Sequence, residues 1–375
     1  MELEFFATAA KGVEEVLADE VGRLGVSEVT LEKGGVRFRG DMESCYRANL
    51  WLRTAQRILM PIAGFSCESP QHLYEGVRTV PWQQYLTPDM TLAVSCNLRD
   101  SKITHSGFAA LKAKDAIVDS IRDTFGRRPD VDSRAPDLQV NLHLVRNHCT
   151  VSLDTSGVSL DKRGYRLDKK EAPLRETLAA AIIELSGWDG SVPLVDPMCG
   201  SGTIPVEAAL KASRRAPGLT RPAYGFQRWS SFDSTTWNAV LKEAQELALE
   251  SLSVPILGTD VSGSALELAQ KNADRAGVGS LVTFSRAGIG ECDPPSSPGI
   301  LLCNPPYGVR LGDEESLKLL YKKLGDTLKK SFQGYTAYVL TGNPLLASCI
   351  GLRPSRRIVL FNGPIECRLL KYEVY

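Results

Sequence analysis

The sequence lacks a net charge, a long hydrophobic run and a closely spaced pair of cysteines. Its 44 lysines and arginines balance 44 aspartates and glutamates, which excludes nucleic-acid binding over a wholly basic surface and leaves only local patches for it. No hydrophobic run approaches the length of a membrane span. The acidic start, Met-Glu-Leu-Glu, lacks the basic segment of a secretory signal. We therefore expect no membrane contact and no secretion.

The cysteines exclude two further classes of protein. All nine lie apart, without a Cys-x-x-Cys pair, so the sequence predicts neither a metal site nor a disulfide framework. This usage favours the reduced cytoplasm. We also expect a monomer.

Three regions follow one another along the 375 residues. Residues 1–65 show a strand, helix, strand, helix, strand pattern, which predicts a small ferredoxin-like α+β domain. Residues 66–170 predict a second α+β unit. Residues 171–375 alternate apolar strands with helices and end in two apolar strands. This last region predicts an α/β, Rossmann-like domain with a seven-stranded sheet closed by an antiparallel hairpin.

A strand that turns into a helix through small residues dominates the third region. The apolar run 192–195 predicts a buried strand, and 204–211 the start of a helix. Such a turn lets a ligand approach bare backbone at the carboxyl end of a parallel sheet. It offers a carboxylate rather than the lysine of a phosphate-binding loop, which suits a ligand with a cation or hydroxyls. The candidate binding residues are Asp196, Cys199, Gly200, Ser201, Gly202 and Thr203.

Two later strands end in polar residues. Residues 299–303 predict a buried strand that leads into Asn304, Pro305, Pro306 and Tyr307, followed by Gly308. Residues 254–260 predict a strand that ends in Asp260, which is also an ordinary N-cap for the next helix. A plain Pro-Pro turn is the alternative for the first group.

The motifs resemble those of S-adenosylmethionine-dependent methyltransferases that modify exocyclic amines of nucleobases. The two segments that carry this resemblance are Asp-Pro-Met-Cys-Gly-Ser-Gly-Thr at 196–203 and Asn-Pro-Pro-Tyr at 304–307. Residues 97–166 resemble a THUMP domain, an RNA-binding module. Segments 215–219, 224–226 and 362–367 resemble the bacterial 23S rRNA guanine-N2 methyltransferases of the RlmL family. In some bacteria that enzyme is fused to a 7-methylguanine methyltransferase, which we expect to be absent here.

The resemblance implies S-adenosylmethionine as cofactor and 23S rRNA as partner. Asp196 is expected to hold the ammonium of the cofactor and Asp260 its ribose hydroxyls. Asn304 and the Pro305 carbonyl would accept from the target amine, Pro306 would stiffen the loop, and Tyr307 would stack on the base. Asn304 is also expected to contact the cofactor. A tRNA guanine-N2 methyltransferase, an N6-adenine methyltransferase and a non-catalytic RNA-binding protein remain alternatives.

One departure from the family concerns the adenine site. The family usually carries an acid at the end of the strand predicted over 281–285, where this chain has Gly288. Glu291 or Asp293 can replace that acid, or backbone groups can suffice.

Two basic segments are candidates for RNA contact. Residues 99–128 hold seven basic and four acidic residues, a local net charge of +3. Residues 162–175 hold six basic and two acidic residues, a net charge of +4, with Tyr165 among them as a stacking ring. A solvated helix face and a charged linker are the plain alternatives. The candidate RNA-binding residues are Lys112, Lys114, Arg163, Tyr165 and Arg166.

The segment 214–229 is irregular and rich in arginine, proline, glycine and aromatic residues. It has the composition of either a lid over the active site or a surface insertion.

Overall fold

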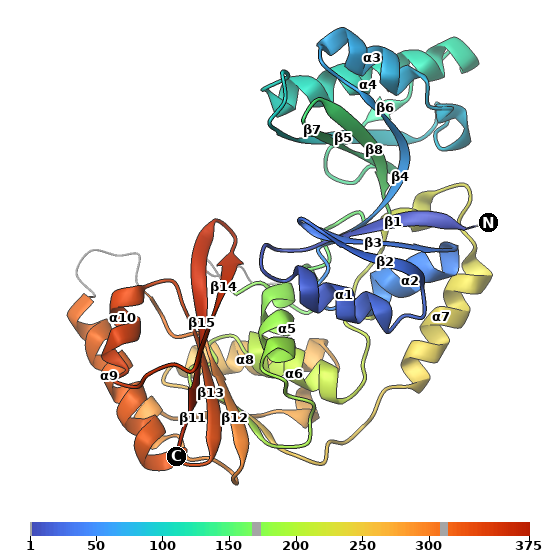
Figure 1. The fold of residues 1–375 in the computed structure, drawn as a ribbon. Coiled ribbons are helices and arrows are strands. Elements are labelled where there is room, and N and C mark those ends of the chain that lie inside the picture. Colours follow the sequence, from blue (N-terminus) through green and yellow to red (C-terminus); the bar gives the residue numbers. More distant parts are fainter. Residues whose placement is uncertain (1, 167–173, 308–313) are drawn as a thin grey trace.

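The protein contains two sheets. The computed structural model describes residues 2–166, 174–307 and 314–375. An eight-stranded sheet in the order β2-β3-β1-β4-β8-β7-β5-β6 is followed by a seven-stranded sheet in the order β11-β10-β9-β12-β13-β15-β14 (Figure 1). The predicted fold class is confirmed: two α+β units precede a Rossmann-like domain. No helix in the described ranges is long and apolar enough to cross a membrane.

The eight-stranded sheet joins the first two units through β4. In register, Ala7 of β1 pairs with Ile58 of β4, and Phe65 at the other end of β4 pairs with Cys149 of β8. The long strand therefore belongs to both units. The elements of this part are β1 (Leu3–Thr8), α1 (Glu14–Gly22), β2 (Ser27–Glu32), β3 (Gly35–Gly40), α2 (Met42–Trp51), β4 (Arg57–Ser66), α3 (Pro70–Arg78), the 3-10 turn η1 (Trp82–Gln84), β5 (Thr91–Arg99), α4 (Ser106–Phe125), β6 (Asp130–Val131), β7 (Leu138–Val145) and β8 (His148–Asp154).

Local signals in the sequence set several of these boundaries. The Asp41 side chain accepts from the Ser44 backbone N–H at 2.9 Å and caps the first turn of α2. Gly126 ends α4 because its φ of +72° is a left-handed conformation that glycine adopts without a Cβ penalty.

The strand order of the seven-stranded sheet reverses at β9, which lies between β10 and β12. Leu194 of β9 pairs with Ile256 of β10 on one side and with Ile300 of β12 on the other, both in parallel. The predicted antiparallel hairpin is present, with β15 lying between β13 and β14. The elements are α5 (Glu176–Leu185), β9 (Leu194–Asp196), α6 (Thr203–Ala212), η2 (Gly225–Arg228), α7 (Ser234–Glu246), β10 (Ile256–Asp260), α8 (Gly263–Arg275), η3 (Gly279–Leu281), β11 (Thr283–Arg286), η4 (Ile289–Glu291), β12 (Gly299–Cys303), α9 (Glu314–Ser331), β13 (Tyr335–Thr341), α10 (Pro344–Cys349), β14 (Arg356–Asn362) and β15 (Ile365–Glu373).

Helices cover both faces of this sheet, so its strands are apolar on both sides. Leu302, Leu340 and Leu369 pack into one core with α5 and α6. Leu301, Val339 and Leu370 pack into another with α9 and α10. A sheet sealed on both faces leaves its carboxyl edge for a ligand, at the point where the strand order reverses.

The segment 214–229 packs into the core of the N-terminal sheet. Tyr224 and Phe226 stack on each other with ring centroids 5.3 Å apart, and Phe226 lies 4.5 Å from Tyr46 of α2. Trp237 of α7 meets the same cluster edge-on. The segment is thus neither a lid nor a surface insertion. It anchors the Rossmann-like domain to the first domain through buried aromatic surface.

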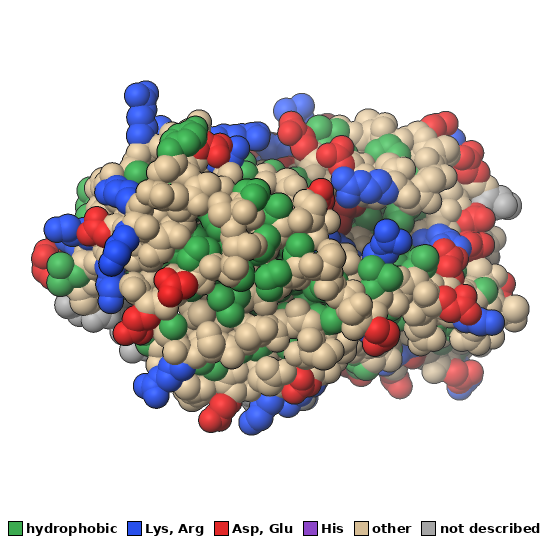
Figure 2. Space-filling model, turned by 90° about the horizontal axis from the view of Figure 1, so that it is seen from below, with side chains coloured by type: hydrophobic (Ala, Val, Ile, Leu, Met, Phe, Trp, Pro, Cys, Tyr) green, Lys and Arg blue, Asp and Glu red, His purple; other side chains and the backbone are tan. Residues whose placement is uncertain are grey.

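The carboxyl edge of the parallel strands faces the N-terminal region. The C-terminus lies at the lower end of the seven-stranded sheet in Figure 1, and β13 runs antiparallel to the last strand, β15. Figure 2 shows the molecule from below, on the opposite side. Basic and acidic side chains are interspersed over the described part of this face, without a field of one sign. Nucleic acid is therefore better sought near the carboxyl edge.

Candidate active site

Backbone N–H groups of the loop after β9 donate hydrogen bonds to the end of β10. The Cys199 N–H donates to the Thr259 carbonyl at 2.9 Å, and the Gly200 N–H donates to Asp260 Oδ2 at 3.0 Å. The structure thus brings the predicted loop 196–203 and the predicted acid Asp260 together. Asn272 of α8 also donates to the Ser201 carbonyl at 3.0 Å, which fixes the tip of the loop.

The two glycines of this loop have different reasons to be glycine. Gly202 has φ +79°, and a Cβ there would lie 2.9 Å from the Ala269 side chain and 3.1 Å from the Phe284 ring. Gly200 has φ +53°, but a Cβ there would meet no atom within 4 Å. Gly202 therefore allows close packing, whereas Gly200 borders open space in which a ligand can approach the backbone.

Asp196 is a buried carboxyl group with unused hydrogen-bonding capacity. Its side chain is 2 % exposed and accepts from the Met198 N–H at 3.2 Å. Burial raises the pKa of Asp196 to about 8, and the nearby negative charge of Asp260 adds to the rise. The group is therefore suited to a cationic partner, which would compensate the cost of its charge.

Asp260 ends β10 with its carboxylate already oriented. Besides Gly200, it accepts from the Ser262 N–H at 2.9 Å. Ser262, and not Asp260, caps α8, because the Ser262 hydroxyl accepts from the Ala265 N–H at 3.3 Å. The alternative role of Asp260 as an ordinary N-cap is thus filled by its neighbour.

Cys199 is poorly suited to act as a nucleophile. Its side chain is 7 % exposed, and burial, followed by the charges of Asp196 and Asp260, raises the pKa of its thiol far above the ordinary value. Its small size fits the turn, since a Cβ on Gly258 of β10 would lie 3.2 Å from its sulfur.

The second motif follows β12 directly and contains an unpaired acceptor. Asn304 is half-buried, and its Oδ1 is buried without a hydrogen-bond partner among the described residues. Leaving a buried amide oxygen unpaired costs about 1–3 kcal/mol. Tyr307 is held beside it, because its hydroxyl accepts from Asn362 Nδ2 at 3.3 Å. Gly308 lies outside the described residues.

Glu291 places a carboxylate next to Gly288, where the family usually has an acidic residue. The Gly288 N–H donates to Glu291 Oε2 at 2.9 Å, and a Cβ on Gly288 would lie 3.4 Å from the same oxygen. Of the two acids weighed from the sequence, Glu291 is the one that folds back onto this strand end.

Family models match in three places: an RlmL ferredoxin-like domain at residues 4–59, a THUMP domain at 67–154 and an RMKL-like methyltransferase domain at 163–371. A putative RNA methyltransferase of Synechocystis sp. is 42 % identical over 99 % of this chain and 97 % of its own length. The chain belongs to this methyltransferase family. The resemblance seen in the motifs is thereby confirmed, as is S-adenosylmethionine as the cofactor.

Other relatives in the family are longer. The ribosomal RNA large subunit methyltransferase K/L of Syntrophotalea carbinolica is 46 % identical over 99 % of this chain but only 54 % of its own length. The K/L protein of Methylococcus capsulatus is 43 % identical over 52 % of its own length. The chain therefore spans about half the length of the K/L relatives that it matches.

Solved structures share the whole architecture. A putative methyltransferase crystallised with S-adenosylhomocysteine has a TM-score of 0.90 and 32 % identity, and the match covers 100 % of this chain and 98 % of that one. A protein of Listeria monocytogenes, described as a predicted N6-adenine-specific DNA methylase, has a TM-score of 0.90 and 33 % identity, covering 100 % and 97 %. TrmN from Thermus thermophilus, at 19 % identity and TM-score 0.73, shares the fold.

Two of the predicted RNA contacts of this methyltransferase, Arg163 and Tyr165, are buried instead, and a third, Arg166, is half-buried. Arg163 and Tyr165 are 2 % and 1 % exposed, and both contact Glu207 of α6. Arg166 donates to the Thr203 hydroxyl at the start of α6 and pairs with Glu176 at 3.5 Å. The prediction of Arg163 and Tyr165 as RNA contacts is therefore wrong, whereas that of Arg166 stays a prediction. All three residues attach the linker to the helix behind the cofactor loop. Lys169 and Lys170 of the same segment lie outside the described residues.

The basic residues of the THUMP domain are half-exposed or exposed but largely compensated. Lys114 pairs with Asp115 at 2.8 Å, and Lys112 lies over the Tyr74 ring at 4.7 Å. Lys102 pairs with Glu68 and Arg127 with Asp89. Exposed ion pairs of this kind contribute little to stability, and their side chains can exchange partners. Lys112 and Lys114 therefore stay candidates for RNA contact.

Proposed function

We propose that this chain transfers a methyl group from S-adenosylmethionine to the exocyclic N2 amine of a guanine in 23S rRNA. The observation that carries the proposal is the buried Oδ1 of Asn304, which follows β12 next to β9 and has no hydrogen-bond partner in the described ranges. An acceptor without a donor predicts a ligand that brings an N–H group. The K/L relatives, named as ribosomal RNA large subunit methyltransferases, support rRNA as the substrate.

The residues around the loop fit the proposed cofactor. When bound, S-adenosylmethionine supplies a methyl group on a sulfonium centre. Asp196 would hold its ammonium, because a buried carboxyl gains from a cation. The carboxylate of Asp260 would accept from the ribose hydroxyls, and that of Glu291 from the adenine amine. Gly200 would leave the backbone open for contact.

The Asn-Pro-Pro-Tyr segment would act on the target amine. A guanine amine is a poor nucleophile because its lone pair is delocalised into the ring, and it becomes more positive as it attacks. The Asn304 Oδ1 and the Pro305 carbonyl would stabilise that charge more than the ground state. Pro305 has no N–H to compete, and Pro306 stiffens the loop. The Tyr307 ring would stack on the extruded base, and no strong general base is needed.

The proposal is tested by transfer of labelled methyl groups to protein-free 23S rRNA and to total tRNA, followed by nucleoside analysis. N2-methylguanosine in 23S rRNA is expected. Label confined to tRNA would point to the tRNA enzyme, and N6-methyladenosine would support the description given to the Listeria relative. A catalytically silent protein would leave RNA binding as the function.

Cofactor binding should release a proton from Asp196 below pH 8. With its pKa raised to about 8, Asp196 is protonated in the free protein at neutral pH, and a bound ammonium would favour the carboxylate. Affinity should therefore rise between pH 6 and pH 7.5. Calorimetry in buffers of different ionisation enthalpy measures the released proton.

Asp196→Asn is the control, because the α-amino group of the ligand itself titrates near pH 8. In the cofactor-free protein the raised pKa means that the native state binds more protons than the unfolded chain between about pH 4 and pH 8. Stability from this group should thus fall as pH rises through that window, and the variant should lose this slope. Equal proton release by both proteins would remove Asp196 from the ammonium site.

A further inference from the structure

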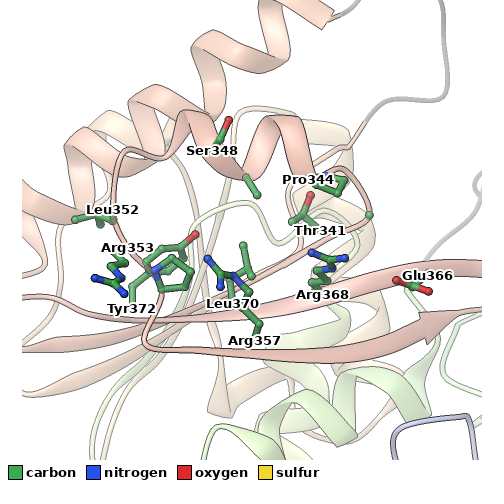
Figure 3. A pocket seen from close by; sticks show the side chains of 13 residues that line it. Thr341, Pro344, Ser348, Leu352, Arg353, Arg357, Glu366, Arg368, Leu370 and Tyr372 are labelled. Carbon is green, nitrogen blue, oxygen red and sulfur yellow. The ribbon is translucent and has the colours of Figure 1, made fainter.

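A cavity of about 560 Å³ lies between α10 and the β14–β15 hairpin, apart from the cofactor loop (Figure 3). Its floor is apolar and includes Leu370 and Tyr372 of β15. Three arginines line it: Arg353 from the loop before β14, Arg357 from β14 and Arg368 from β15. Figure 3 shows the guanidinium groups of Arg357 and Arg368 rising from the hairpin toward α10.

Strand alternation places two of these arginines on one face of the sheet. Arg357 pairs with Leu370, and Val359 pairs with Arg368, so Arg357 and Arg368 are diagonal neighbours across β14 and β15. Arg356 precedes Arg357 and therefore points to the opposite face. The segment 351–371 holds five basic residues and one acidic residue, a net charge of +4.

The three arginines are exposed and lack compensating acids. Within the described ranges, none of their side chains forms an ion pair or a hydrogen bond, and Glu366 is the single carboxylate lining the cavity. The cavity thus has a local charge of +2, counted as three arginines less one glutamate. In contrast, Lys102, Lys114 and Arg127 of the THUMP domain each pair with an acid. Uncompensated guanidinium groups in a cavity favour an anionic ligand such as phosphate.

One end of the cavity adjoins the catalytic loop. Gly342 lines the cavity at the end of β13, and a Cβ there would lie 3.3 Å from the Tyr307 ring. Asn362, the last residue of β14, donates to the Tyr307 hydroxyl. A nucleic-acid strand with one base stacked on Tyr307 can therefore continue directly into the space between the β14–β15 hairpin and α10.

We propose that this cavity binds the phosphates of the RNA strand that flanks the methylated nucleotide. The proposal rests on the proposed function, since it assigns the substrate strand of the same site. Arg357 and Arg368 contact phosphate oxygens, Arg353 contacts the strand further along, and the apolar floor accepts a sugar or an unstacked base. The RNA strand is then held both at Tyr307 and at the arginines. This fixes its register, and the register determines which nucleotide reaches Asn304.

The test compares three variants of the full chain in binding to protein-free 23S rRNA over a range of salt concentrations. Arg357→Gln with Arg368→Gln should weaken binding at least about tenfold, or about 1.4 kcal/mol, because the double variant loses charge-assisted hydrogen bonds to phosphate. The salt slope should fall by about 0.7–0.9 for each lost contact. Arg356→Gln is the matched control and should bind like the unaltered chain. Glu366→Gln should bind more tightly.

Calorimetry with S-adenosylhomocysteine checks that the double variant keeps its cofactor site and its fold. In methyl transfer its KM for RNA should rise while kcat changes little. Unchanged RNA affinity and salt slope in the double variant, or an equal loss in Arg356→Gln, would overturn the cavity as an RNA site. If the unaltered chain methylates no RNA, the proposed function fails, whereas the binding comparison still decides the cavity.

Discussion

Replacement of Asn304 by alanine should lower methyl transfer at least about a hundredfold, by analogy with removing one hydrogen-bonding group from an oxyanion hole. The Asn304 Oδ1 is buried and has no hydrogen-bond partner among the residues that the structure describes, so its acceptor capacity is available for the amine that gains positive charge. Cofactor and RNA affinities should change little, since the interaction strengthens mainly in the transition state. Single-turnover transfer of labelled methyl groups to 23S rRNA measures the loss.

Tyr307→Phe provides the matched control for this experiment. It removes the hydroxyl that accepts from Asn362 but keeps the ring, so much of the activity should remain if stacking is the role. Full-speed transfer by Asn304→Ala would show that the Asn-Pro-Pro-Tyr segment does not act on the amine.

Replacement of Glu207 by glutamine should destabilise the protein by about 3–5 kcal/mol, the usual cost of leaving one partner of a buried ion pair uncompensated. The side chains of Arg163 and Glu207 are 2 % and 0 % exposed, with 3.4 Å between Nε and Oε1. Tyr165 also donates to Glu207 at 3.1 Å. Chemical denaturation gives the free energy of the first unfolding transition, because a chain with several domains need not unfold in one step.

Lys242→Ala is the matched control, since Lys242 pairs with Glu246 at 3.8 Å with both side chains more than half exposed. It should cost less than about 1 kcal/mol. Arg163→Met combined with Glu207→Leu should recover part of the loss, because no buried charge is then unpaired. If Glu207→Gln costs no more than Lys242→Ala, the pair does not hold the linker to α6.

The sequence alone determined the elements of the Rossmann-like domain and the place of its candidate site. Apolar runs bounded by glycine, proline and polar residues are local signals, and each of the strands that end in Asp196, Asp260 and Asn304 was visible as such a run. Parallel strands bring their carboxyl ends to one edge, so the three residues had to meet there. The hairpin 356–373 followed from the same local patterns.

Only the tertiary structure decided which polar groups are free and which are compensated. The charges of residues 162–175 predict a basic patch. In the structure, however, Arg163 contacts Glu207, which is 44 residues away in the sequence, and both side chains are buried. The sequence offers both Glu291 and Asp293 as the acid of the adenine site. In the structure the turn η4 directs the Glu291 carboxylate back to Gly288, which favours Glu291. The segment 214–229 has the composition of a loop, yet its aromatic rings pack against Tyr46 of α2 in the core of the N-terminal sheet. Ion pairs and aromatic contacts join residues that are distant in sequence. The composition of one segment therefore cannot predict which residue will be its partner.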